Sequence, residues 1–261
     1  MIVSNRPSAA RALRLTSLAI ATLAAAACGT KDAPDPLQPS GAVGRVRFVN
    51  LITDPARNPV NAIFDGVPFG VNLTYTTATP ASLSSPSTAF YSSTLAGARS
   101  IVLKKTADTA VTVATIAVNV TADNDYTVFA TGGTGGTAVS SFITADVNTP
   151  IATGQTRIRV TNMSPAAGAV DVFITAANAD LATATPVAAG LANRAVFAGA
   201  TLAPGTYSVR TVPAGTAAAA RNAAVNSTVA VTVAAGNGRT VVVADAAAGG
   251  TPLRSFVLSD Q

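Results

Sequence analysis

The sequence contains an internal repeat, and this duplication constrains the fold more than any other feature. The matching segments keep the same order, at offsets that drift only between about 106 and 114 residues. Chance matches would not stay collinear, so the sequence predicts two tandem domains, at residues 44–148 and 156–261. The clearest pairs are GRVRFVN (Gly44–Asn50) with TRIRVTN (Thr156–Asn162), PVNAIFD (Pro59–Asp65) with AVDVFIT (Ala169–Thr175), and SSFITAD (Ser140–Asp146) with RSFVLSD (Arg254–Asp260).

Each copy reads as a series of short strands. In the opening segments, apolar residues alternate with Arg45 and Arg47 in the first copy and with Arg157 and Arg159 in the second. A period of two places the apolar set on one face of a strand and the arginines on the other. We expect the arginine face to be solvated, the usual setting for such charges. Segment VTVATIAVNV (Val111–Val120) also alternates, and a slip in its phase between Val113 and Ile116 predicts a β-bulge.

Composition and turn signals favour an all-β fold. Strong helix formers are scarce, β-branched residues abound, and all twelve acidic residues are aspartate. Six or seven short strands per copy, separated by turn residues and without βαβ spacing, predict two tandem antiparallel β-sandwiches. The chain has no tryptophan and a single cysteine, so immunoglobulin-like describes only the expected architecture.

Both copies resemble the bacterial domain of unknown function 4397 family, over roughly residues 44–260. The first copy matches less well, because it carries a Ser/Thr-rich insertion at Leu73–Ser93. The resemblance implies an exported surface or periplasmic β-domain, often in tandem, and brings no catalytic residue. The best matching segments are TRIRVTNMSPAAGAVDVFI (Thr156–Ile174), TLAPGTYSV (Thr201–Val209) and TPLRSFVLSD (Thr251–Asp260).

The first 27 residues have the organisation of an export signal. A basic segment with Arg6, Arg11 and Arg14 precedes the apolar Leu15–Ala27, which is short for a membrane span and ends in small residues. No Arg-Arg pair is present, so the general secretory route is expected. The alternative is a buried N-terminal helix, but an Ala-rich helix would contribute little apolar burial.

Cys28 is predicted to carry a lipid. Ala25-Ala26-Ala27-Cys28 resembles a bacterial lipobox, in which the cysteine becomes the acylated first residue of the mature protein. The family prefers leucine where this chain has Ala25, and an ordinary signal peptidase could also cut here and leave a free thiol. Gly29 follows in place of an inner-membrane retention aspartate, so we expect attachment to the outer membrane or cell surface. Residues 28–43 then form a Pro-rich tether.

Charge argues against nucleic-acid binding. The chain has 17 lysines and arginines against 12 acidic residues, and loss of the signal leaves 14 against 12. No basic run is longer than Lys104-Lys105.

The residue inventory argues against an enzyme and against a bound cofactor. The chain has no histidine, the commonest general base and metal ligand, and an acylated Cys28 cannot act as a nucleophile. Asp123 and Asp125 are weak candidates for a Ca²⁺ site, but a polar hairpin turn explains them more simply. TGGTGGT (Thr131–Thr137) lacks the Lys-Ser/Thr of a phosphate loop and is expected to be a plain loop.

These observations predict a non-enzymatic, envelope-anchored lipoprotein, a structural or interaction module with a protein or glycan partner. If one loop contacts that partner, we expect it to be the segment around residues 73–93, where Tyr75, Phe90 and Tyr91 lie. The alternative is a solute- or glycan-binding lipoprotein that uses this loop or a cleft between the domains. A hydrolase is the least expected function, because histidine is absent.

Overall fold

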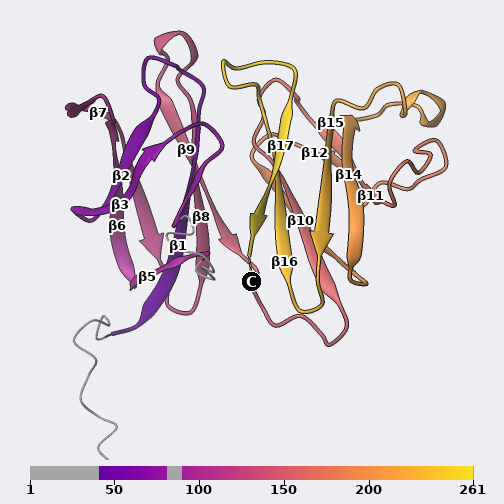
Figure 1. Ribbon diagram of the computed structural model, residues 1–261, viewed down its shortest axis with the longest axis horizontal. Coiled ribbons are helices and arrows are strands. Elements are labelled where there is room, and N and C mark those ends of the chain that lie inside the picture. The colour runs from indigo at the N-terminus through magenta and orange to yellow at the C-terminus, as the bar shows by residue number, and fades with distance from the viewer. Residues whose placement is uncertain (1–40, 81–89, 261) are drawn as a thin grey trace, which may run out of the picture. The chain divides into compact units, whose positions relative to one another are not determined.

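The computed structural model describes residues 41–80 and 90–260, and this part of the chain is almost entirely β-structure (Figure 1). Strands β1–β9 belong to the first repeat and β10–β17 to the second, with two short 3₁₀ turns. The strands of the first repeat are β1 (Val43–Ile52), β2 (Val60–Phe64), β3 (Val67–Leu73), β4 (Ala78–Thr79), β5 (Ser92–Leu95), β6 (Gly97–Lys105), β7 (Asp108–Val120), β8 (Asp125–Gly132) and β9 (Val139–Asp146). Those of the second are β10 (Thr156–Asn162), β11 (Val170–Thr175), β12 (Ala188–Leu191), β13 (Ala195–Leu202), β14 (Gly205–Pro213), β15 (Ser227–Val233), β16 (Gly238–Ala244) and β17 (Arg254–Ser259).

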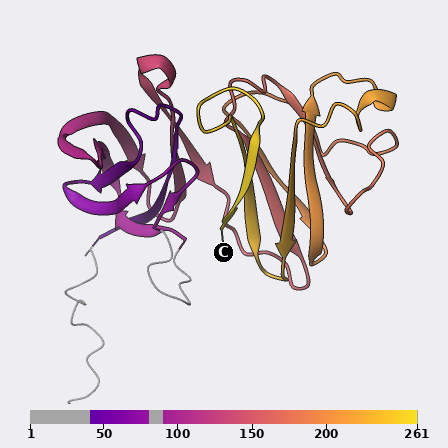
Figure 2. The same cartoon turned by 45° about the horizontal axis from the view of Figure 1, so that its top comes forward.

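Each repeat is a sandwich of two sheets, as the sequence predicts. The first has sheets β4-β1-β8-β9, with β5 also on β1, and β3-β2-β6-β7; the second has β13-β10-β16-β17 and β12-β11-β14-β15. We call β4-β1-β8-β9 and β13-β10-β16-β17 the inner sheets, because they lie between the other two, the outer sheets, in both views (Figures 1 and 2). The strands pair antiparallel except β1 with β8 and β10 with β16, which run parallel. Among the described residues, no strand of one repeat pairs with a strand of the other.

The Ser/Thr-rich insertion divides one strand of the first repeat. In the second repeat β13 pairs with the whole length of β10, whereas in the first repeat β4 and β5 share that place along β1. Residues 81–89, in the middle of the insertion, lie outside the described part. The insertion therefore replaces the middle of an edge strand, where an extra segment leaves the rest of the sheet intact.

The β6–β7 pair and the glycine-rich segment agree closely with the sequence predictions. The pairing of β6 with β7 shifts register between Thr112 and Ala114, slightly ahead of the bulge expected between Val113 and Ile116. The glycine-rich segment forms a connection between β8 and β9 that contains only the short turn Thr134–Gly136, so the expectation of a plain loop is confirmed.

Each sandwich has its own apolar core. Phe48, Ile101 and Leu103 are among the fully buried residues of the first core, and Ile158, Val160 and Val241 among those of the second. A buried asparagine ends the repeated opening motif in both copies, and its side chain makes the same kind of contact in each. Asn50 Nδ2 donates to the Leu73 carbonyl at 2.9 Å, and Asn162 Nδ2 donates to the Leu191 carbonyl at 3.0 Å.

The expectation of a solvated arginine face is wrong for Arg47 and Arg159. Arg45 is exposed and Arg157 is half-buried, but Arg47 and Arg159 are each only 2% exposed. The reason is that the second face of β1 packs against the inner sheet of the other repeat, so β1 is buried on both faces along most of its length. Alternation of apolar and charged residues here marks two different buried environments rather than core and solvent.

Candidate functional site

The most unusual chemistry of the described chain is an ion network buried between the two inner sheets. Arg47 on β1 and Arg159 on β10 lie between Asp146, at the end of β9, and Asp260, just after β17. Arg47 Nη2 lies 3.4 Å from Asp146 Oδ2 and 3.1 Å from Asp260 Oδ1. Arg159 Nη1 lies 3.4 Å from Asp146 Oδ1, and its Nη2 lies 3.1 Å from Asp260 Oδ1. Each arginine therefore bridges one carboxylate from each repeat.

Two threonines repeat the symmetry of the network. Arg47 Nη2 donates to Thr127 Oγ1 on β8 at 2.9 Å, and Arg159 Nε donates to Thr240 Oγ1 on β16 at 3.0 Å. Thr127 in turn donates to Asp146, and Thr240 donates to Asp260 Oδ2 at 2.8 Å. Arginine, threonine and aspartate thus occupy the same strand positions in both repeats. Buried charges require such partners, because isolated ions lose their hydration on burial.

Tyr91 closes the network on the side of the first repeat. Its hydroxyl donates to Asp146 Oδ2 at 2.7 Å, and the Arg47 guanidinium carbon lies 4.5 Å from the ring centroid. The guanidinium therefore stacks over the ring while it pairs with the carboxylates, a cation–π arrangement. Arg45 lies at 5.6 Å from the same ring and makes a two-point contact with Asp125, with both distances 2.6 Å.

Burial perturbs the titration of these groups. Burial raises the pKa of Asp146 above its usual value, and Arg159 and Arg47 only partly oppose this effect. Burial also raises the pKa of the Tyr91 hydroxyl, against the opposing charge of Arg47. For Arg159, burial lowers the pKa, but the carboxylates of Asp260 and Asp146 outweigh it and raise the pKa overall. The side chains of Asp146 and Asp260 are only 4% and 3% exposed, so both carboxylates are shielded from solvent beside their arginine partners.

An apolar cluster extends the contact between the inner sheets. Its buried members come from both repeats, and Tyr75 packs against them while its hydroxyl donates to the Asp245 carbonyl at 2.7 Å. The hollow that remains beside Tyr75 measures only 160 Å³, below the about 300 Å³ at which ligand pockets begin. The buried members are Val49, Leu51, Phe129, Met163, Val242, Ala244 and Leu258.

The three aromatic residues suggested for partner contact lie in different surroundings. Tyr91 is only 7% exposed, and its ring and hydroxyl are engaged in the ion network. Tyr75 is half-buried at the apolar cluster, and Phe90 is half-buried at the edge of the segment outside the described part. Both tyrosines thus contact the network or the other repeat, and partner contact by this segment stays a prediction.

The two aspartates suggested for a metal have separate environments. Asp125 Oδ1 and Oδ2 accept hydrogen bonds from the Arg45 guanidinium, and Asp125 Oδ2 also accepts a hydrogen bond from Asn148 at 2.5 Å. Asp123 lies in the turn before β8 with a φ of 60°. No group of three or more candidate metal ligands occurs in residues 41–80 and 90–260. The left-handed turn position of Asp123 fits the hairpin interpretation, since aspartate tolerates this conformation.

Cys28, the predicted lipidation site, lies outside the described residues. Within the described part, no helix has the length and apolar character needed to cross a membrane.

The sequence reading did not identify the network, although one signal was present. Arg47 and Arg159 lie at matching places in the opening motif, and Asp146 and Asp260 both end the closing motif. Charged residues kept at the same position in two otherwise diverged copies indicate a shared structural role. The repeated arginines could therefore have been predicted to pair with the repeated aspartates.

The described residues form two β-sandwiches in contact through a buried ion network, which defines an all-β protein. Residues 44–173, which span the first sandwich, β10 and the first part of β11, match the family described as "Domain of unknown function (DUF4397)". The chain is a DUF4397-like protein.

Two solved structures show a remote likeness to this chain. A family CBM26 module from Eubacterium rectale, solved in complex with maltoheptaose, has a TM-score of 0.24 and 12% identity, with 82% of this chain and 97% of that chain covered. A leucine-rich repeat protein from Bacteroides thetaiotaomicron has a TM-score of 0.19 and 12% identity, with 82% of this chain and 26% of that chain covered. TM-scores this low support no functional argument. Curated proteins gave no match.

Proposed function

We propose that this protein is a non-enzymatic lipoprotein, anchored in the bacterial cell envelope through Cys28, whose two sandwiches act as one rigid structural or interaction module. The observation that carries the proposal is the ion network, because it joins the repeats through Arg47, Arg159, Asp146 and Asp260. Domains on a flexible linker would move independently, whereas movement of these repeats would separate buried charges from their partners, which is costly.

The linker between the repeats supports the same reading. Arg157 Nη1 donates to the Val147 carbonyl at 2.7 Å, and its Nη2 lies 3.2 Å from Thr149 Oγ1. The segment that joins β9 to β10 is therefore held against the second repeat. A module built in this way presents its outer surfaces to envelope partners at fixed spacing.

The anchor rests on the sequence alone. Cys28 follows an export-signal pattern and precedes a Pro-rich tether, and the cysteine is the only one in the chain. Several acyl chains on one residue would hold the protein firmly, since a single chain binds a membrane only marginally.

Metabolic labelling with an alkyne palmitate analogue tests the anchor. The native protein should incorporate the label and sediment with membranes, whereas Cys28→Ser, which removes the only thiol, should do neither. Mass spectrometry of the tryptic peptide Cys28–Lys31 from native membranes gives an independent readout. An unmodified cysteine in this peptide, or a chain that retains residues 1–27, would refute the anchor.

The alternative, solute binding between the domains, requires a deep cleft there. The described contact between the inner sheets is filled by the ion network and the apolar cluster, so the observations favour the module instead.

A further inference from the structure

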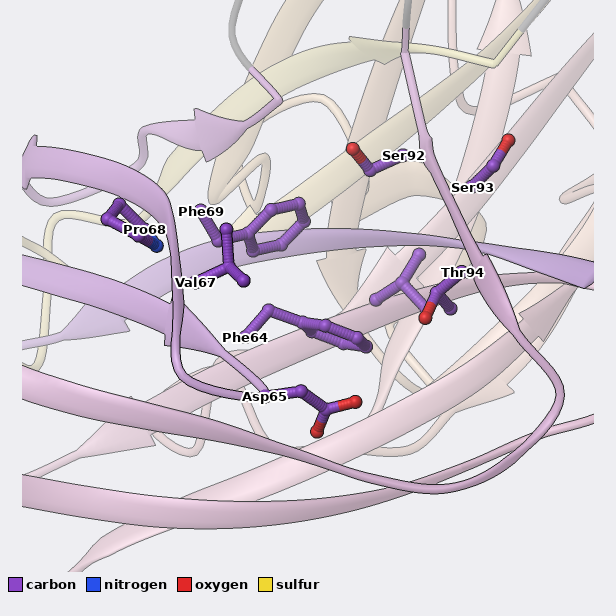
Figure 3. Close-up of a pocket in the computed structure, with 9 residues that line it drawn as sticks. Phe64, Asp65, Val67, Pro68, Phe69, Ser92, Ser93 and Thr94 are labelled. Atoms are coloured by element: carbon purple, nitrogen blue, oxygen red, sulfur yellow. The ribbon is translucent and has the colours of Figure 1, made fainter. Parts of the chain in front are cut away.

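A pocket of 310 Å³ opens at one end of the first sandwich, between its two sheets (Figure 3). Val46 of β1 is one of its lining residues and lies on the face of the strand that belongs to the sandwich core. Phe64 and Phe69, whose ring centroids are 5.5 Å apart, line one wall. Ser92 and Thr94 of β5 line the opposite wall. The volume falls within the range of small-ligand sites, about 300–1,000 Å³.

Strand register places both hydroxyl residues toward the interior. Ser92 is paired directly with Val46, and Thr94 with Gly44. Directly paired residues of antiparallel strands point to the same face, and residues two apart share that face. Ser92 and Thr94 therefore face the same side as the buried Val46.

In the second sandwich, larger apolar side chains occupy the place that corresponds to the pocket. There Ile158 pairs with Ala200, and Thr156 pairs with Leu202. Leu202 therefore holds the place of Thr94, and its side chain packs against the second core. The first repeat has a smaller, polar residue where the second has a leucine.

A second position shows the same contrast. Arg99 is paired with Val118 of the first core, and Tyr207 is paired with Val231 of the second. Tyr207 packs against its core, whereas the Arg99 guanidinium turns to the Leu95 and Ala96 carbonyls. The opening thus follows from particular side chains of the first repeat and not from the fold.

The chemistry of the pocket favours a neutral ligand. Asp65 is the acidic residue of its lining, and its carboxylate accepts a hydrogen bond from the Ser100 amide at 2.8 Å and lies 3.3 Å from Arg99 Nη1. The aspartate charge is therefore already balanced. An anionic ligand would meet this carboxylate, and a cationic one would compete with Arg99.

An alkyl chain and a sugar ring are two neutral ligands that could lie against the phenylalanine rings. The hydroxyl groups of Ser92 and Thr94 favour the sugar. An alkyl chain would leave the hydroxyls of Ser92 and Thr94 desolvated without partners, which costs free energy. A sugar ring offers an apolar face of C–H groups to the aromatic pair and hydroxyls to the opposite wall.

We propose that this pocket binds one ring of a neutral saccharide, with its C–H face on Phe64 and Phe69 and its hydroxyls toward Ser92, Thr94 and Asp65. The pocket lies on the core face of β1, opposite to the face that carries Arg47. The inference therefore goes beyond the proposed module and does not depend on the ion network or on the anchor.

The test is titration of the purified protein with methyl glucoside and with methyl N-acetylglucosaminide, followed by amide NMR shifts and calorimetry. A single-ring ligand should bind with a Kd in about the millimolar range and shift the amides of residues 64–67, 69 and 92–94. Octanoate serves as the alkyl probe.

Two variants test the position of the ligand. Thr94→Leu introduces the residue found in the second repeat and should weaken glycoside binding at least about tenfold, and Ser92→Ala, which removes only a hydroxyl, about fivefold. The matched control Leu202→Thr, in the second sandwich, should leave the binding at residues 64–69 and 92–94 unchanged. Thermal melts confirm that each variant is folded, and Ser92→Ala keeps the test valid if Thr94→Leu does not fold.

Two results would overturn the proposal. One is the absence of shifts at residues 64–69 and 92–94 with either glycoside at about 20 mM, well above the expected Kd. The other is binding of octanoate without binding of the glycosides, which would make the pocket an alkyl site.

Discussion

Arg47 and Asp260, separated by 213 positions in the sequence, meet in the interior with 3.1 Å between Nη2 and Oδ1. Arg47 Nη1 also donates to the carbonyl of Ser259 at 2.7 Å, so one side chain holds both the backbone and the carboxylate at the end of β17. The first strand of the first repeat is thereby tied to the last strand of the second. We therefore expect the ion pair with Asp260 and the hydrogen bond to the Ser259 carbonyl to break in one step if the repeats separate.

Replacement of Arg47 by methionine should strongly destabilise the protein. The aliphatic stem is kept, but Asp146 and Asp260 lose a cation while they stay buried, and broken buried pairs typically cost about 3–5 kcal/mol. Urea unfolding monitored by circular dichroism measures the change in the free energy of unfolding. Arg254→Met, at an exposed position, is the control and should change it by no more than about 0.5 kcal/mol.

A double-mutant cycle separates the pair from its surroundings. Arg47→Met combined with Asp260→Asn should cost clearly less than the sum of the two single changes, because the residues share one network. Additive costs, or equal costs for Arg47→Met and Arg254→Met, would contradict the assignment of Arg47 to the network.

Asp146 should give the protein a distinctive acid response. Burial raises its folded-state pKa above 3.8, so between 3.8 and that higher value the native state binds more protons than the unfolded state. This group therefore opposes folding at neutral pH, and its cost disappears as the pH falls through the folded pKa. Asp146→Asn removes the titration. The stability of wild type relative to Asp146→Asn should increase from pH 7 to about pH 4, as measured by urea unfolding at each pH.

Other carboxylates titrate in both proteins and cancel in this comparison. A stability difference that stays constant over the same range, or one that shrinks toward acid pH, would show that Asp146 does not hold its proton more tightly in the folded state.

The fold was readable from the sequence because a strand is encoded locally. Alternation in GRVRFVN and TRIRVTN indicates strands, and the collinear repeats indicate two domains. Together they predict two β-sandwiches. The parallel pairing of β1 with β8 was not readable. It depends on which strand fills the place beside β1 after the chain has passed through the outer sheet.

The ion network could not be predicted from alternation, since an arginine on a solvated face and Arg47 on a buried ionic face give the same pattern. The difference lies in two distant partners. Asp146, 99 residues away, is brought near Arg47 by the strand order of the first repeat, and Asp260, 213 residues away, by the packing of the two repeats. The pocket could not be predicted from the sequence either. The equivalence of Thr94 with Leu202 depends on strand register, and the insertion between β4 and β5 obscures that register in the sequence.

Tyr91 and Tyr75 should ionise later than ordinary tyrosines. Burial raises the pKa of both hydroxyls above the usual value of 10.0, with Asp245 adding to the effect at Tyr75. Ultraviolet difference titration of wild type against Tyr91→Phe and against Tyr75→Phe isolates each phenol. In both comparisons the amplitude lost should lie above pH 10, and the folded state should lose stability as the pH rises past that point. A lost amplitude centred at pH 10 would mean that the phenol is accessible to water.

Met163 tests whether the apolar cluster holds the repeats together. It is 2% exposed and packs in the cluster shared by both inner sheets, outside the two sandwich cores. Met163→Asp places a charge between the repeats, and the protein can hydrate that charge by separating them while both cores survive. Far-ultraviolet circular dichroism should then stay close to wild type, while the linker at residues 147–155 should become much more sensitive to elastase. The control Val71→Asp, at a residue that is 68% exposed, should leave the linker as resistant as in wild type. If the linker of Met163→Asp stays protected until the whole chain unfolds, the contact between the repeats does not depend on this cluster.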